Sequence, residues 1–298
     1  MKGISLVKAG GPENLKYDDV ALPKLGDGQV MIEVYATALN GADLLQRAGK
    51  YPQPPGASEI LGLEVAGIVH EVSQGVTKFK KGDKVMALLD GGGYAQYAAA
   101  PEGFVMPMPK NLSFAEAAGI PEVFLTAYLE LVMLGGLSKG QSVLIHAGAS
   151  GVGTAAIQDL TMCNQHKAIP GGPKPAPGVN VILDLVGASH FSANLQSLTI
   201  EGKLLLVGVP SGVKAEIDLA SCLGKRLQII GSTMRARPKQ FKETIVANFT
   251  SFAGDKFSTG EMKPIIDKQF KLSDCKEAHE YMEAKKNKGK IVLIVREQ

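Results

Sequence analysis

A glycine-rich stretch at residues 142–158 carries the clearest chemistry in this chain of 298 residues. An apolar segment is followed by Gly148, Gly151 and Gly153 and then by small residues that favour a helix. We expect Gly148 to permit a tight turn, Gly151 to let backbone approach a pyrophosphate, and Gly153 to let the helix pack closely. Unpaired N–H groups at the start of that helix would attract phosphate. The stretch therefore predicts part of a dinucleotide site, made by Gly148, Ala149, Ser150, Gly151, Val152 and Gly153.

Simpler roles for the same residues stay open. The order of glycines is Gly-x-x-Gly-x-Gly rather than the usual Gly-x-Gly-x-x-Gly, and an ordinary strand-to-helix turn can look alike. Ser150 can donate its hydroxyl to a phosphate or only cap the helix. His146 ends an apolar run, so we expect a hydrogen-bonded core histidine rather than a catalyst. No carboxylate pair and no Ser/His/Asp set stands out in the sequence, so hydrolysis has little support.

The segment after the glycine loop does not continue as such a domain should. The residue that contacts the adenosine ribose normally stands about 20 residues beyond the glycines, which places it at 172–174. Residues 168–178 instead hold four prolines, Pro170, Pro173, Pro175 and Pro177, and proline is excluded from central strands. Lys174 is either a weak substitute contact for phosphate or, as we favour, a solvated linker residue.

Composition limits the class of protein. The chain is 45% hydrophobic and 20% charged with a net charge of +3, and no basic stripe is present, so nucleic acid is a poor partner. Lys285, Lys286, Lys288 and Lys290 are expected to form a solvated end. Three cysteines far apart indicate neither a disulfide framework nor a metal pair. Without a signal segment or an apolar run of about 18 residues, we expect a cytoplasmic protein and no membrane partner.

Elements that would position the loop can be read from hydrophobic periodicity. Residues 30–36, 64–72 and 84–89 read as strands in a Gly- and Pro-rich first part, with a short helix within 38–48. Ser113 and Glu116 have the spacing of a capping box; we expect Pro121 to end that helix and 125–134 to form another. Nearly continuous apolar strands at 143–146, 179–186, 203–208 and 227–231 predict a parallel α/β sheet. A helix at 273–286 and a strand at 290–295 are expected to return to the first domain.

Several motifs together resemble the zinc-free quinone oxidoreductase branch of the medium-chain dehydrogenase/reductase superfamily. They are residues 38–51, 61–67, 93–97, 147–153, 278–282 and 289–293. The resemblance covers nearly the whole chain. It implies an α/β protein with a GroES-like β-barrel domain at 1–121 and 265–298, and a truncated Rossmann (doubly wound parallel) domain at 122–264 that binds NADP.

The resemblance also implies site residues. The substrate of the family lies between the two domains, where Asn40 and Tyr51 match positions near the nicotinamide and the quinone. Turn chemistry for Asn40 and an ordinary loop role for Tyr51 remain the alternatives. Thr126 and Gly208 match cofactor contacts. Zinc-dependent relatives carry Cys where Asn40 stands and His where Leu63 stands, and neither residue present can hold Zn²⁺, so no metal is expected.

Compared with the family, roughly thirty residues are missing, about one strand-helix-strand unit. The usual strand order is 3-2-1-4-5-6, so the expected order is 1-4-5-6, with strand 143–147 at an edge. The helix after this strand then has to move to the other face, or the crossover is left-handed, or the segment is partly disordered. The lost segments carry side chains that hold the 2′-phosphate.

The leading hypothesis is therefore an NADPH-dependent enzyme that transfers hydride to a quinone or an enone, with cofactor binding weakened by the gap. The family implies a homodimer, through strand 227–232. A catalytically impaired isoform that acts as a dimerisation partner is one alternative, and an enoyl-thioester reductase is another.

Overall fold

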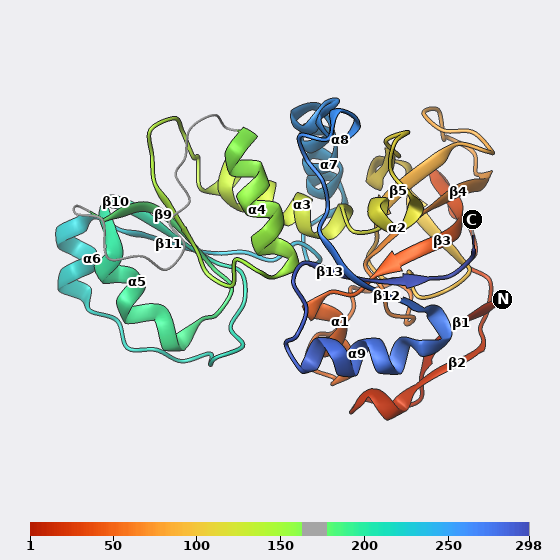
Figure 1. The fold of residues 1–298 in the computed structure, drawn as a ribbon, viewed down its shortest axis with the longest axis horizontal. Helices are drawn as coiled ribbons and strands as arrows, with labels where there is room; N and C mark the ends of the chain where they lie inside the picture. The colour runs from red at the N-terminus through yellow and green to blue at the C-terminus, as the bar shows by residue number, and fades with distance from the viewer. Residues whose placement is uncertain (163–177, 298) are drawn as a thin grey trace. The chain divides into compact units, whose positions relative to one another are not determined.

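The computed structural model describes residues 1–162 and 178–297, which fall into two compact units. The first unit contains Met1–Leu125 and Arg235–Gln298, and the second contains Thr126–Met234 (Figure 1). Lys174 and Cys163 lie outside the described residues. The two units are described one at a time.

An antiparallel sheet forms the body of the first unit. Its strand order is β12-β13-β3-β4-β5-β7, and β6 also pairs with β3. The buried side chains of β3, β4, β5 and β6 make one core cluster that includes Val34, Val65 and Ala98. A separate ribbon of β1 and β2 packs with the C-terminal part of the unit around Ile4 and Tyr94. The strands are β1 (Lys2–Leu6), β2 (Leu15–Asp19), β3 (Gln29–Ala38), β4 (Glu64–Val72), β5 (Lys84–Leu88), β6 (Tyr97–Pro101), β7 (Val105–Pro107), β12 (Ile266–Lys271) and β13 (Lys290–Ile294).

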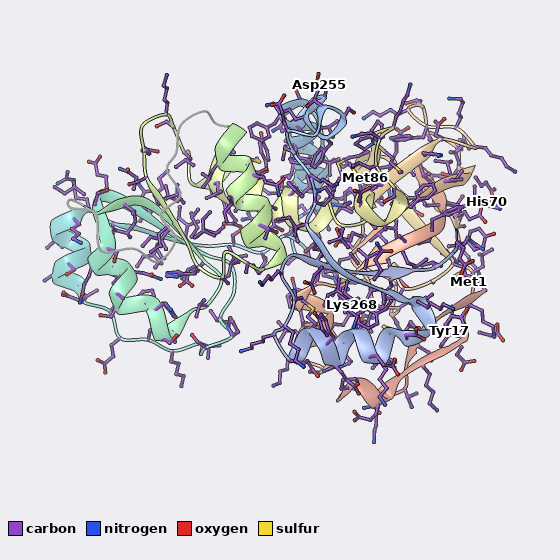
Figure 2. The ribbon with its side chains drawn as sticks, in the orientation of Figure 1. Met1, Tyr17, His70, Met86, Asp255 and Lys268 are labelled. Carbon is purple, nitrogen blue, oxygen red and sulfur yellow. The ribbon has the colours of Figure 1, made fainter. Side chains whose placement is uncertain are left out.

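The C-terminal tail returns to this sheet, as the sequence predicts. Strand β13 pairs antiparallel with β3, and β12 pairs parallel with β13. Helix α9 (Cys275–Glu283) contacts both β12 and β13. Lys268 of β12 is labelled in Figure 2, and its ammonium group lies 4.8 Å from the ring centroid of Tyr281 on α9. The tail is thus an integral part of the first unit.

Residues 235–264 also belong to the first unit, whereas the expected cofactor domain ran over 122–264. Helix α7 (Lys239–Ala253) contacts the 3-10 turn η2 (Glu102–Phe104), and α8 (Lys256–Thr259) follows it. Phe249 and Phe257 pack around Phe124 in an aromatic cluster. Burial of these rings explains why the segment joins this unit. Whether residues 122–264 act together as one functional domain stays a prediction.

Short helices complete the first unit. Helix α1 (Gly41–Arg47) begins after Asn40, and α2 (Phe114–Ala117) begins at the predicted capping box, where the Glu116 amide donates to the Ser113 hydroxyl at 3.3 Å. The expectation that Pro121 ends this helix is wrong, because α2 already ends at Ala117; Pro121 is the first residue of α3 (Pro121–Tyr128), where a missing N–H is harmless. The first unit ends within α3, after Leu125, and the helix continues in the second unit as a π-helical turn, η3 (Leu129–Leu134). The other 3-10 turns of the first unit are η1 (Pro12–Asn14) and η5 (Leu272–Asp274).

The second unit contains a parallel sheet of four described strands in the order β11-β10-β9-β8. These are β8 (Val143–Ile145), β9 (Val179–Asp184), β10 (Leu198–Leu206) and β11 (Gln228–Gly231). This is the expected order 1-4-5-6, with the first strand of the unit at one edge. Strand β10 starts before the expected residue 203, because a register shift between Leu198 and Lys203 lets both parts pair with β9.

Helices flank this sheet. Helix α4 (Gly151–Met162) contacts β8, whereas α5 (Phe191–Ser197) and α6 (Leu219–Lys225) contact β10, and a 3-10 turn, η4 (Ala188–His190), precedes α5 (Figure 1). The connection from α4 to β9 runs through residues 163–177, outside the described part. The hand of that crossover therefore stays a prediction.

One apolar stretch, Phe114–Leu134, is long and apolar enough to cross a membrane by length and composition alone, which the sequence analysis did not expect. However, 78% of its most apolar window is buried inside the fold. A core helix passes the same test, so the stretch is weak grounds for a membrane segment.

Candidate active site

The glycine loop lies where β8 passes into α4, as predicted. The His146 amide donates to the Leu183 carbonyl at 3.0 Å, which carries the pairing with β9 to the end of the strand. The chain then turns, and the Ser150 amide donates to the Ala147 carbonyl at 2.8 Å. Helix α4 begins at Gly151 directly after this turn.

Two glycines of the loop have different roles from one another. A Cβ added to Gly153 would lie 2.4 Å from the Ala147 carbonyl oxygen, so only glycine lets the helix approach the loop. A Cβ on Gly148 would meet nothing closer than 3.7 Å, and the left-handed residue of the turn is Ala147, with φ of 50°. The tight turn thus depends on Ala147, not on Gly148 as the sequence suggested.

The start of α4 fits a phosphate group. The Gly153 amide donates to the Ser150 hydroxyl at 3.1 Å, so Ser150 caps the helix. Among the described residues, the amides of Ala149, Gly151 and Val152 have no hydrogen-bond acceptor. Such N–H groups at a helix start form an anion site, and the loop therefore has what a pyrophosphate requires.

Gly208 lies at the same edge of the sheet as the glycine loop. The carboxyl ends of parallel strands meet at one edge, and the Val207 amide, just after β10, donates to the Asp184 carbonyl at 2.9 Å. A Cβ on Gly208 would lie 3.4 Å from the Leu185 carbonyl oxygen. The second unit thus brings the loop 148–153, after β8, and Gly208, after β10, to the carboxyl ends of two strands that are separated by β9.

His146 is hydrogen-bonded, as the sequence predicted. Its Nε2 atom lies 2.6 Å from Asn194 Oδ1, and the Asn194 amide donates to Asp184 Oδ2 at 3.0 Å. The other Asp184 oxygen accepts from the amides of Val186 and Gly187. This network stiffens the strand ends that carry the loop. Thr126 is buried on α3, and its expected contact with a cofactor stays a prediction.

Asn40 in the first unit is buried in a network of charged groups. Its side-chain amide donates to Glu64 Oε1 at 2.8 Å, and its carbonyl oxygen accepts from the Lys290 ammonium at 2.6 Å. Lys290 also forms an ion pair with Glu64 at 2.8 Å, with side-chain exposures of 3% and 0%. Most of the hydrogen-bonding capacity of Asn40 is therefore used within the protein, and its contact with a quinone stays a prediction.

Lys290 corrects the expectation of a solvated lysine-rich end. It lies at the start of β13, and it donates to the Leu39 carbonyl at 2.7 Å as well as to Asn40 and Glu64. A buried ammonium group needs such partners. The lysine is structural, and it holds Asn40 in place from the far end of the chain.

Asp43 caps the start of α1, and it is completely buried. It accepts hydrogen bonds from the Asn40 amide at 2.8 Å, the Tyr94 hydroxyl at 3.0 Å and the Gly62 amide at 3.2 Å. Burial raises the pKa of Asp43 to about 6, although these donors favour the charged form. Its contacts point to a role in holding the turn rather than in chemistry.

Tyr51 is half-buried, and an arginine that the sequence analysis did not consider lies over its ring. The Arg235 guanidinium carbon lies 5.6 Å from the Tyr51 ring centroid. Arg235 also donates to the Asp90 carbonyl at 2.6 Å and to Gln46 Oε1 at 2.7 Å. Burial raises the pKa of Tyr51 above its usual value, and the nearby Glu122 carboxylate adds to this shift. Arg235 therefore orients the Tyr51 ring.

The residues that sequence reasoning missed are Glu64, Glu122, Arg235 and Lys290. Glu64 and Lys290 carried a usable signal, because each adjoins a run of apolar strand residues where a charge requires a partner. Glu122 and Arg235 had no such signal. Among residues 1–162 and 178–297, no group of three His, Cys, Asp or Glu side chains could hold a metal ion.

A GroES-like β domain joined to a parallel α/β domain with a glycine loop defines a dehydrogenase or reductase that uses a nicotinamide dinucleotide. Comparisons with known proteins agree. Residues 26–110 match the alcohol dehydrogenase GroES-like domain, and residues 171–293 match the zinc-binding dehydrogenase family. A quinone oxidoreductase of Lama guanicoe is 30% identical, covering 99% of this chain and 98% of the relative.

Solved structures are similar over the whole chain. An NAD-dependent alcohol dehydrogenase has a TM-score of 0.84 at 26% identity, with 99% of this chain and 100% of that chain covered. A mycobacterial protein in complex with NADPH has a TM-score of 0.83 at 26% identity, with the same coverage. The chain belongs to the medium-chain dehydrogenase/reductase superfamily, and it has quinone oxidoreductases among its relatives.

The alignment with the Lama guanicoe protein also supports the internal gap. It runs over 329 positions, whereas this chain has 298 residues, so at least 31 positions have no residue of this chain. This agrees with the roughly thirty missing residues that the strand count suggests. The glycine loop is therefore present in a chain that is shorter than this relative.

Proposed function

We propose that this protein is an NADPH:quinone oxidoreductase, which transfers hydride to a quinone or an enone. The observation that carries the proposal is the start of α4. Several amides there have no acceptor among the described residues, and a Cβ on Gly153 would lie 2.4 Å from the Ala147 carbonyl oxygen. Bound there, the reduced nicotinamide cofactor would supply hydride. The amides of Ala149, Gly151 and Val152 would hold its pyrophosphate, and Gly208 would leave room for its nicotinamide end.

The first unit would supply the acceptor residues. Tyr51, held by Arg235, offers a flat aromatic face on which a quinone ring can stack. Asn40 is fixed by Glu64 and Lys290. Its side-chain nitrogen also lies 3.4 Å from the Ala38 carbonyl oxygen, so the second amide hydrogen makes only a weak hydrogen bond. That hydrogen is the one available to a quinone oxygen.

Weakened binding of the adenosine end is part of the proposal. Loss of two or three charge-assisted hydrogen bonds at about 1.5–3 kcal/mol each would lower affinity by a few orders of magnitude. Because the chain has no tryptophan, the intrinsic fluorescence of NADPH is the direct signal for a titration. The same titration with NADH measures how much preference for the 2′-phosphate remains.

The decisive experiment combines that titration with steady-state oxidation of NADPH in the presence of quinones, an enone and an enoyl thioester. Turnover with quinones supports the proposal, and turnover with the thioester alone would favour an enoyl-thioester reductase. No fluorescence change up to millimolar NADPH, together with no turnover, would refute it. Micromolar affinity with a clear preference for NADPH would instead refute the damaged adenosine site.

A second candidate is a catalytically impaired isoform that acts as a dimerisation partner. Strand β11 lies at an edge of the described sheet, and large apolar side chains are exposed near it, including Leu223 at 81% and Ile229 at 37%. Such a surface favours pairing with a second copy through residues 227–232. Sedimentation of the chain alone, and of a mixture with a full-length relative, tests both the homodimer and the mixed dimer.

A cytoplasmic location, also proposed, agrees with the free thiols of Cys222 and Cys275.

A further inference from the structure

The carboxyl group of Glu122, an acidic residue near the proposed acceptor residues, accepts no hydrogen bond from any described residue. Glu122 stands at the second position of α3, and its backbone amide donates to Glu64 Oε2 at 2.8 Å. Among the described residues, nothing donates a hydrogen bond to its carboxyl group, and the residue as a whole is half-buried. Its main chain is fixed while its side chain is free to act.

The neighbouring acids differ from Glu122 in this respect. Glu64 is fully buried, and its oxygens are taken by Lys290, Asn40 and the Glu122 amide. Asp43 is fully buried as well, with three donors on its oxygens. Neither can exchange a proton with solvent or reach a bound molecule. Among the described residues, Glu122 is the acid of this group whose carboxyl group accepts no hydrogen bond and whose residue is not fully buried.

Glu122 belongs to the same unit as Asn40 and Tyr51, the proposed acceptor residues. The Glu64 carboxylate accepts one hydrogen bond from the Glu122 backbone amide and another from the Asn40 side chain, so it links the two residues. The Glu122 carboxylate also raises the pKa of Tyr51, after the larger effect of burial.

We propose that Glu122 is the acid that delivers a proton to the reduced quinone, an inference that rests on the proposed function. Hydride from the reduced cofactor, which is thereby oxidised, brings two electrons and one hydrogen to the quinone and leaves a hydroquinone monoanion. The O–H bond of Glu122 then breaks as the O–H bond of the second phenol forms. Glu122 remains as a carboxylate until a proton from water restores it.

The charges around Glu122 keep it protonated at neutral pH. Burial raises the pKa of Glu122 to about 8, and the Glu64 and Asp43 carboxylates act in the same direction, whereas Lys290 and Arg235 oppose it. The start of α3 also favours the charged form, but burial and the adjacent Glu64 outweigh it. A carboxyl group whose pKa is raised by its surroundings is typical of a general acid.

The first test does not depend on activity. Carbon-13 NMR of side-chain carboxyl groups in the cofactor-free chain should show one glutamate that titrates with a midpoint near 8. Glu122→Gln should remove this signal, and Glu277→Gln, at an exposed position on α9, should leave it in place. A Glu122 carboxyl that titrates in the ordinary range would overturn the proposal.

The second test is the pH profile of quinone reduction. Because general acid catalysis contributes about 10²–10⁴-fold, Glu122→Gln should lower kcat at pH 7 by at least about 100-fold. The decline of kcat above pH 8 should vanish. The KM for quinone and the dissociation constant for NADPH should not change, Glu122→Asp should recover part of kcat, and Glu277→Gln should match the parent chain.

The outcomes separate the two proposals. A parent chain that is active while Glu122→Gln keeps its kcat and pH profile contradicts the proton donor alone. A chain that binds NADPH but reduces no quinone contradicts the proposed function, and the donor role with it. A rise in KM or weaker NADPH binding with unchanged kcat would make Glu122 a binding residue and also overturn the donor role.

Discussion

Asp159 is a buried carboxyl group whose replacement should change the folding stability of this chain. The residue lies within α4 at 1% exposure, and neither carboxylate oxygen has a hydrogen-bond partner in the described structure. Burial raises the pKa of this carboxyl well above its ordinary value. Asp159→Asn keeps the size of the side chain and removes the charge, so it should stabilise the protein near neutral pH.

The sign and size of this effect follow from linkage. Below about pH 4 the carboxyl is protonated in both folded and unfolded states, so the two proteins should be nearly equal in stability. As pH rises, the unfolded state loses its proton first, and the parent chain loses stability by up to about 1.4 kcal/mol per pH unit. The loss stops once the folded carboxyl ionises. We expect a gain of about 1–3 kcal/mol for Asp159→Asn at pH 7–8, the usual penalty of a buried polar group without partners.

Urea unfolding followed by far-ultraviolet circular dichroism from pH 4 to 8 measures this gain, since the chain has no tryptophan to report on it. Glu216→Gln, which removes an exposed carboxyl from the same unit, is the matched control and should have no effect. An equal difference between Asp159→Asn and the parent at pH 4 and pH 8 would refute the reasoning. So would a variant that is less stable at every pH.

Three further predictions concern other parts of the molecule. Gly153→Ala places a Cβ 2.4 Å from the Ala147 carbonyl oxygen, so it should lower the free energy of unfolding by about 1–3 kcal/mol and weaken the NADPH affinity measured by fluorescence titration. Gly224→Ala adds a Cβ in open space and should change neither quantity. Equal effects of the two substitutions would contradict a close-packed loop. Lys290→Met should lower the free energy of unfolding by about 3–5 kcal/mol, because it removes the partner of the buried Glu64 carboxylate. Adding Glu64→Gln should recover part of that loss in urea unfolding. A double variant that is no more stable than Lys290→Met would contradict the pairing. Burial and the nearby Arg47 lower the pKa of His279 to about 3, so folding stability should fall as pH drops from about 6.5 toward 3, and His279→Gln should flatten that part of the profile; a profile identical to that of the parent chain would show that His279 does not carry it.

Much of the fold was readable from the sequence. Strand β4 begins and ends at the expected residues, the cap at Ser113 and Glu116 is present, and β13 pairs with β3. The parallel sheet has the predicted order, with β8 at an edge. These features depend on local spacing and on continuous apolar runs, which a sequence displays directly.

The candidate site was only partly readable. The loop 148–153 and Gly208 both lie at the carboxyl end of the parallel sheet, but the left-handed residue of the turn is Ala147. The ion cluster of the first unit joins Asn40 to Lys290 across 250 positions of sequence. No local pattern connects residues so far apart, and the buried state of Lys290 could not be seen beside three other lysines.

The amino-acid sequence by itself determined that a strand would pass through a glycine-rich turn into a helix, because backbone geometry around glycine is a local property. It also determined that a strand-helix-strand unit would be short, since prolines cannot enter a central strand. Only the tertiary structure decided which acid is paired and which is free. Glu64 and Glu122 are the same residue type, and their difference comes from Lys290, a charge that folding brings to one of them.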